Sequence, residues 1–297
     1  MRLRRDLVRR WLPSPDATRR MAIDINRLWD FDQPALSEAR FRAALIGASP
    51  DDALVLQAQI ARSYVLRGET QPALEILRAI EANVAVSGSE AQVCYWLELG
   101  RAHASPAHPP EALTWKAQTQ ARQAFQEAFR RAKAAGLDPH AIEALHLMAF
   151  TENDPERQGM HERDALRFVQ FSQQEAAQRW ECAVRIGLAQ ALIRLQNHAD
   201  AVSELQAATR AGTRMGTTHC ARSAQWFLGW AYRMAGQLNE ALALQLELEQ
   251  SAAGSLPLLR AVLDELGWLY QALGDDERAR LYRARALAPL GGLSKDD

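Results

Sequence analysis

A two-residue motif recurs along this chain at nearly even intervals, a large apolar residue followed by a small one. Its copies are Ile60-Ala61, Leu99-Gly100, Met148-Ala149, Leu188-Ala189, Leu228-Gly229 and Leu266-Gly267. Successive copies lie 39, 49, 40, 40 and 38 residues apart. Such a period is typical of stacked helical repeats, in which each repeat contacts only its neighbours.

Further positions keep the same register. Three residues after the small residue stand Tyr64, His103, Leu192, Tyr232 and Tyr270, and four residues further stand Gly68, Gln196, Gly236 and Gly274. Five residues beyond those stand Ala73, Ala201, Ala241 and Ala279. A small residue lets two helices approach closely, and glycine ends a helix in the left-handed conformation. We therefore expect each copy to form helix A, which carries the motif, and helix B, which follows the glycine.

Three segments carry the pattern most fully: "LQAQIARSYVLRGETQPALEILRAI", "AQWFLGWAYRMAGQLNEALALQLELEQ" and "LDELGWLYQALGDDERARLYRARALAP". In this register the chain resembles the tetratricopeptide repeat family from about residue 16 to 290, with repeats of about 40 residues similar to those of bacterial regulatory proteins. The resemblance implies an all-α, right-handed superhelical solenoid of six to seven antiparallel helix pairs with a concave face.

The predicted helix boundaries follow from caps and breakers. We expect a first pair at 16–29 and 34–46, with Asp16 as N-cap, and a last helix that ends near Ala288 before Pro289. Two segments, 105–120 and 151–163, are longer than the repeat requires. Prolines in the first predict a loop followed by a long helix over 110–135, and the second is interpreted as an insertion. Whether either segment covers a groove stays open at this stage.

Composition excludes several classes of protein. The formal net charge is −1, so the chain as a whole is not a strongly basic nucleic-acid binder. No apolar run is long enough for a transmembrane helix, and the first twenty residues lack the apolar core of a signal peptide. Three widely spaced cysteines argue against a disulfide framework and favour a reducing compartment. A cytoplasmic location is therefore predicted.

In the arrays that this chain resembles, the concave wall is mostly helix A. The position after the small residue and the position four residues earlier share a helix face there. The residues that we predict to line a partner-binding groove on this basis are Trp226, Trp230, Trp268, Phe150, His146, Arg62, Arg101, Arg233 and Gln190. The tryptophans would form an aromatic end of the groove and the arginines a cationic end. Both residue types are enriched at binding hot spots. The alternative is that these aromatic residues pack in the core, as stripes at helical spacing often do.

Motifs of catalysis are missing from the sequence. There is no GxxxxGK[ST] or GxGxxG phosphate loop and no GxSxG nucleophile elbow. The seven His and three Cys lack the close spacing of a zinc site. We therefore predict no catalytic residues, no cofactor and no metal.

The first twenty residues contain seven Arg and two Asp. Residues 1–15 are predicted to be a basic arm or capping helix, residues 16–290 the repeat array, and residues 291–297 a polar tail. A basic amphipathic arm can bind anionic lipid or phosphate, whereas the simpler interpretation is a capping helix with a solvated Arg face.

The sequence thus predicts a non-catalytic scaffold or adaptor that binds a protein or peptide segment, for instance one with an acidic or carboxylate group. No nucleic-acid partner and no membrane span are expected, and a homodimer is conceivable. Two alternatives stay open at this stage. One is a peptide-responsive regulator, and the other is a nucleic-acid or membrane accessory protein that acts through the Arg-rich arm.

Overall fold

The computed structural model describes residues 24–252 and 255–288, and these residues form helices and short connections without a strand. The predicted arm (1–15), the predicted N-cap Asp16 and the predicted tail (291–297) lie outside the described residues, so their roles stay predictions.

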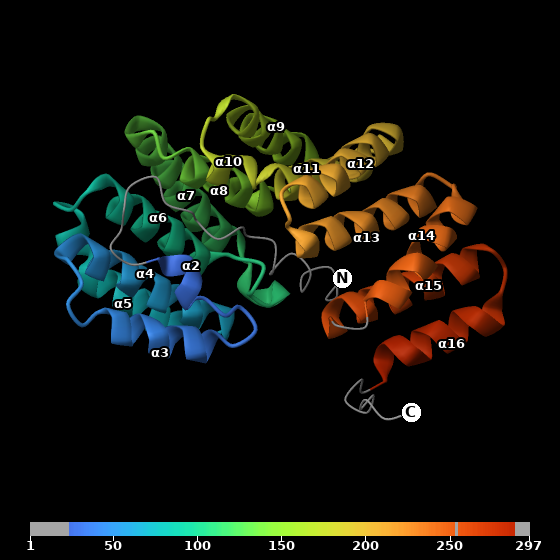
Figure 1. Ribbon diagram of the computed structural model, residues 1–297, viewed down its shortest axis with the longest axis horizontal. Coiled ribbons are helices and arrows are strands. Elements are labelled where there is room, and N and C mark those ends of the chain that lie inside the picture. Colours follow the sequence, from blue (N-terminus) through green and yellow to red (C-terminus); the bar gives the residue numbers. More distant parts are fainter. Residues whose placement is uncertain (1–23, 253–254, 289–297) are drawn as a thin grey trace. The chain divides into compact units, whose positions relative to one another are not determined.

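Consecutive helices alternate between the two kinds that the repeat predicts (Figure 1). The first helix A is short, α2 (Ile25–Leu28). The other helices A are α4 (Pro50–Leu66), α6 (Ser89–His103), α8 (Asp138–Thr151), α11 (Glu181–Arg194), α13 (Thr218–Met234) and α15 (Leu256–Ala272). The helices B are α3 (Pro34–Ala44), α5 (Thr70–Val84), α7 (Trp115–Ala135), α9 (Pro155–Phe171), α12 (His198–Arg214), α14 (Leu238–Ser251) and α16 (Asp276–Leu287). Two short elements stand between pairs, the 3-10 turn η1 (Pro110–Ala112) and α10 (Glu175–Gln178).

The helices group into two compact units. The N-terminal unit contains the described residues up to Gly187, and the C-terminal unit contains those from Leu188 onwards. The boundary falls inside α11, so the chain passes from one unit to the other within a helix and not through a linker. In the N-terminal unit α4 packs against α3, α5 and α6, and α8 packs against α7, α9 and α10. In the C-terminal unit α13 packs against α12, α14 and α15.

The small residues of the motif lie where the two helices of a pair come closest. A β-carbon added to Gly100 would collide with the ring of Phe125 on α7, and one added to Gly229 would collide with the Gln245 side chain on α14. At Gly267 it would lie 2.7 Å from Cγ of Arg283 on α16. The predicted close approach of helix A to helix B is therefore confirmed in these three pairs.

The predicted helix ends are confirmed as well. Gly68, Gly236 and Gly274 follow helices A with φ of +81°, +77° and +80°. Gln196, which stands in the place of the glycine after α11, also has a positive φ of +62° and is the one non-glycine residue of the described chain that does. The repeat imposes the left-handed conformation here even without glycine.

Three predicted segments differ from the structure. The first helix, expected over 16–29, is described only from residue 24, where Asp24 is an extended N-cap and the helix is the single turn Ile25–Leu28. The long helix expected over 110–135 is divided, because its regular part begins only at Trp115, where the Thr114 hydroxyl accepts a hydrogen bond from the Ala117 N–H. The segment 151–163, interpreted as an insertion, contains the first half of α9, with Asp154 as N-cap. It is helix B of its pair, so the interpretation of this segment as an insertion is wrong.

Candidate functional site

Four charged side chains meet in the N-terminal unit, each at most 3% exposed: Arg62 on α4, Glu98 and Arg101 on α6, and Glu143 on α8. Arg101 donates to Glu98 through Nη1, with 2.6 Å between Nη1 and Oε1, and also donates to Glu143. Nη1 of Arg62 lies 3.8 Å from the same Glu98 oxygen. We call these four residues the buried ion network. It joins three successive helices A.

The two carboxyl groups of the network have different environments. Burial raises the pKa of Glu98 in spite of the two nearby guanidinium groups. Burial acts in the same direction on Glu143, but Arg101 and Arg62 outweigh it and hold the pKa of that carboxyl below its usual value. Glu98 is therefore the carboxylate that takes up a proton more readily.

Several atoms of the network make no hydrogen bond although they are buried, namely Nε of Arg62, Nε of Arg101 and Oε2 of Glu98. The guanidinium of Arg62 is covered by the aromatic rings of Trp29 and Phe31, whose centroids lie 5.4 and 5.5 Å from its Cζ atom. Trp29 itself donates its indole N–H to Gln59. Arg62 and Arg101, predicted to be the cationic end of a groove, are thus enclosed in this structure.

His146 forms a second buried ion pair, next to the network on α8. Its Nδ1 lies 3.0 Å from Oε2 of Glu162 on α9, and its ring lies 5.8 Å from that of Trp180. Burial lowers the pKa of His146, but the Glu162 carboxylate outweighs burial and raises it. Two further predicted groove residues, Phe150 and Gln190, are partly exposed.

The three predicted tryptophans do not form one surface. Trp226 and Trp230 are buried, at 3% and 7% exposure, and both make edge contacts with Phe227. Trp268 is 47% exposed and lies under the guanidinium of Arg283, at 4.4 Å from its Cζ atom. The alternative of core packing therefore describes the positions of Trp226 and Trp230.

Arg233 also has a partner, because its guanidinium donates to both oxygens of Glu265 on α15, at 2.5 and 3.2 Å. Such a two-point contact fixes a guanidinium firmly. A binding role stays a prediction for each of the nine predicted groove residues.

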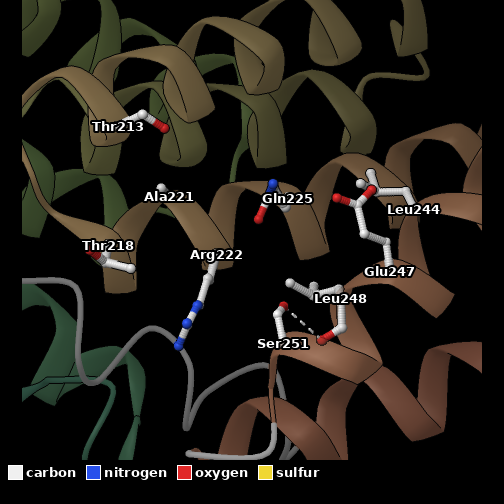
Figure 2. Close-up of a pocket in the computed structure, with 9 residues that line it drawn as sticks. All are labelled: Thr213, Thr218, Ala221, Arg222, Gln225, Leu244, Glu247, Leu248 and Ser251. Carbon is white, nitrogen blue, oxygen red and sulfur yellow. Dashed lines mark hydrogen bonds between the residues drawn. The ribbon is translucent and has the colours of Figure 1, made fainter.

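A pocket of about 290 Å³ lies between the C-terminal end of α12 and the helices α13 and α14 (Figure 2). It has an apolar part and a polar rim. Its lining residues are Thr213, Thr218, Ala221, Arg222, Gln225, Leu244, Glu247, Leu248 and Ser251. We call it the α13–α14 pocket.

The fold agrees with solved helical-repeat structures. A signal-transduction ATPase with numerous domains from Pyrococcus horikoshii, described as having a tetratricopeptide repeat sensor, superposes with a TM-score of 0.63 at 14% identity. The match covers 85% of this chain and 38% of the ATPase, so the chain spans little more than a third of that protein's length. The apo form of RapI superposes with a TM-score of 0.62 at 13% identity, over 88% of this chain and 72% of RapI.

A third structure, NprR in complex with its cognate peptide NprX, superposes with a TM-score of 0.56 at 13% identity, over 88% of this chain and 75% of NprR. The fold is that of a tetratricopeptide repeat protein. No protein-family model and no curated protein sequence matches the chain.

The tetratricopeptide register explains why the sequence pointed to a different part of α13. It directs attention to the helix A positions around the small residue, where Trp226 and Trp230 stand. The α13–α14 pocket instead uses residues nearer the start of α13, at Thr218, Arg222 and Gln225. Their spacing of four and three residues was the available signal, because residues at such spacing share a helix face.

Metal-binding and membrane-spanning features are missing from the part of the chain that the structure describes. No group of three or more His, Cys, Asp or Glu is arranged to hold a metal ion there. No described helix is both long and apolar enough to cross a membrane. Cys94 is buried and unbonded, whereas Cys182 and Cys220 are disulfide-bonded. The expectation that the cysteines form no disulfide is wrong for these two residues, and the argument from cysteine for a reducing compartment no longer holds.

Proposed function

We propose that this tetratricopeptide repeat protein is a non-catalytic scaffold that binds a peptide or protein segment carrying a carboxylate. The observation that supports the proposal most strongly is the buried ion network. Three successive helices A contribute its charged side chains, and three of their buried polar atoms, Nε of Arg62, Nε of Arg101 and Oε2 of Glu98, make no hydrogen bond. Burying such atoms without hydrogen bonds lowers stability, so their presence points to a role other than stability.

Binding at the network would use the two arginines. Arg62 and Arg101 both contact Oε1 of Glu98, the carboxylate with the raised pKa. A ligand carboxylate would take the place of Glu98 between the two guanidinium groups once the Trp29 and Phe31 rings move aside. Arginine suits this role because its planar fork matches a carboxylate at two points. The peptide complex of NprR supports a peptide as the ligand, since the two chains share a fold.

The proposal assigns no catalytic role to the buried groups. The charged side chains of the network and the His146–Glu162 pair are engaged with one another. A peptide-responsive regulator is compatible with the same site, because a ligand that displaces Glu98 would change how α4, α6 and α8 pack.

The test is affinity purification from the source organism followed by mass spectrometry. The bait variants are Arg62→Lys, which keeps the charge but loses the fork, and Arg167→Lys as the matched control at an exposed arginine paired with Asp164. Circular dichroism first verifies that all three proteins are equally folded. A protein recovered with the wild type and the control but lost with Arg62→Lys supports the proposal. Equal recovery with Arg62→Lys would place binding elsewhere, and recovery of nucleic acid or lipid would favour the predicted accessory role of the arm.

A further inference from the structure

The α13–α14 pocket has the size and lining of a site for a small molecule. At about 290 Å³ it is just smaller than the range for pockets of drug-sized ligands, which runs from about 300 to 1,000 Å³. Ala221 and Leu248 are buried and give it an apolar floor together with the partly buried Leu244. Thr213 and Ser251 already donate their hydroxyl groups to backbone carbonyls within their own helices.

The charged residues of the pocket have no partners in the described chain. Arg222 and Glu247 make neither an ion pair nor a hydrogen bond there, and the Gln225 amide makes no hydrogen bond. Figure 2 shows Arg222 and Glu247 extending from different helices, with no interaction drawn between them.

Arg222 is partly buried and Glu247 is exposed, whereas some other charged residues on the same two helices are paired. Arg233 on α13 binds Glu265, and Glu249 on α14 binds Arg285 at 2.6 Å. The pocket therefore holds one unpaired cation and one unpaired anion beside an apolar floor.

We propose that the α13–α14 pocket binds a free α-amino acid with an apolar side chain. The guanidinium of Arg222 takes the ligand's carboxylate, and the carboxylate of Glu247 takes its ammonium group. The apolar side chain covers Leu244 and Leu248, and the Gln225 amide, which also lines the pocket, donates or accepts a hydrogen bond. A ligand with both charges satisfies two groups that the chain leaves unpaired, and the volume limits it to roughly the size of an amino acid. This site is separate from the proposed peptide site at the buried ion network, and neither proposal depends on the other.

The experiment is isothermal titration calorimetry of the full chain with L-leucine, L-valine and L-phenylalanine as probes. Two blocked analogues of leucine separate the contacts. Leucinamide lacks the carboxylate, and N-acetyl-leucine lacks the ammonium. We expect the wild type to bind at least one of the three amino acids, and both blocked forms of leucine to bind about tenfold more weakly than leucine itself, because each loses a charge-assisted hydrogen bond.

Two variants assign the contacts, and two further variants are matched controls. Arg222→Gln should bind leucine and leucinamide equally, and Glu247→Gln should bind leucine and N-acetyl-leucine equally. Arg210→Gln on α12 and Glu240→Gln on α14 change exposed residues outside the pocket and should bind as the wild type does. No heat with any of the three amino acids at millimolar concentration would overturn the proposal. So would undiminished leucine binding by both pocket variants. Neither result would bear on the Arg62 experiment, which tests another site.

Discussion

At the scale of single residues, Gln196 has the conformation that the repeat reserves for glycine. Its φ is +62°, and its side chain is exposed, with Oε1 lying 3.3 Å from Nε2 of the neighbouring His198. The strain of this conformation lowers the free energy of unfolding by about 1–2 kcal/mol for a non-glycine residue. Glycine avoids the strain, but its more flexible unfolded chain offsets part of the gain in stability.

We therefore predict that Gln196→Gly raises the free energy of unfolding by about 0.5–1 kcal/mol. The reciprocal change, Gly68→Ala, should lower it by about 1 kcal/mol, because Gly68 has φ of +81° and an added β-carbon would contact nothing. Urea denaturation of both variants measures the two values. A loss of stability in Gln196→Gly would show that the side chain makes a contribution that outweighs the strain.

His146 gives stability a dependence on pH. Its folded pKa is raised above the ordinary value of 6.5, so its contribution is complete below pH 6.5 and disappears as the pH rises through the folded pKa. The folded pKa values of His103, His140 and His161 are lowered, so these residues change stability only below pH 6.5.

We expect the free energy of unfolding to fall as the pH rises from about 6.5 to 8, and His146→Gln to remove this fall. Denaturation by urea at half-unit steps of pH measures it. His161→Gln is the control and should keep the slope above pH 6.5. A flat wild-type profile in this range would contradict the assignment to His146.

At the scale of elements, the N-terminal unit buries charges in place of apolar side chains between α4, α6 and α8. Removing one member of a buried pair leaves an uncompensated charge, whereas removing both can be nearly neutral. Glu143→Leu leaves two arginines against one glutamate, and Arg101→Met/Glu143→Leu leaves the pair Arg62 and Glu98.

We predict that Glu143→Leu lowers the free energy of unfolding by about 3 kcal/mol and that the double variant recovers most of the loss. Chemical denaturation of the wild type, Glu143→Leu, Arg101→Met and the double variant gives the four unfolding free energies of a double-mutant cycle. Additive losses would mean that Arg101 and Glu143 do not interact energetically.

The elements also show where a sequence pattern is ambiguous. The segment 151–163 has Asn, Asp and Pro at positions 153–155 and few large apolar residues, which is the composition of a loop. Asp154 and Pro155 are instead the N-cap and first residue of α9, as Asp and Pro often are at helix starts. α9 can be polar because it buries only a narrow stripe, including Ala165 and Val169. Neighbouring helices, and not its own composition, decide that it folds as a helix.

At the scale of the whole molecule, helices of a repeat array are stabilised by their neighbours in sequence. A substitution that disrupts the packing of one helix pair should therefore destabilise that pair and the helices next to it, and not the distant ones. Gly100→Ala forces the added methyl group into the Phe125 ring, between α6 and α7.

We predict that Gly100→Ala reduces hydrogen-exchange protection of α6, α7 and their packing partners α4, α5 and α8, and leaves α15 and α16 as in the wild type. Mass spectrometry of peptides from each helix measures this. Replacing Phe125 by Leu in the same chain should restore part of the protection, since it removes atoms that clash. An equal loss of protection in α15 and α16 would mean that the chain unfolds as one cooperative unit.

The sequence by itself determined the features that depend on local conformation and spacing. The recurring small residues, the glycines after helices A and the period of about 40 residues specify helix pairs that approach closely, because each depends on a few neighbouring residues. The tertiary structure alone decided which polar residues are enclosed and with whom. Arg62 and Arg101 occupy predicted groove positions, yet they pair with Glu98 and Glu143 on other helices of the unit. The partners lie up to 42 residues apart in the chain, and no local pattern specifies a contact over that distance.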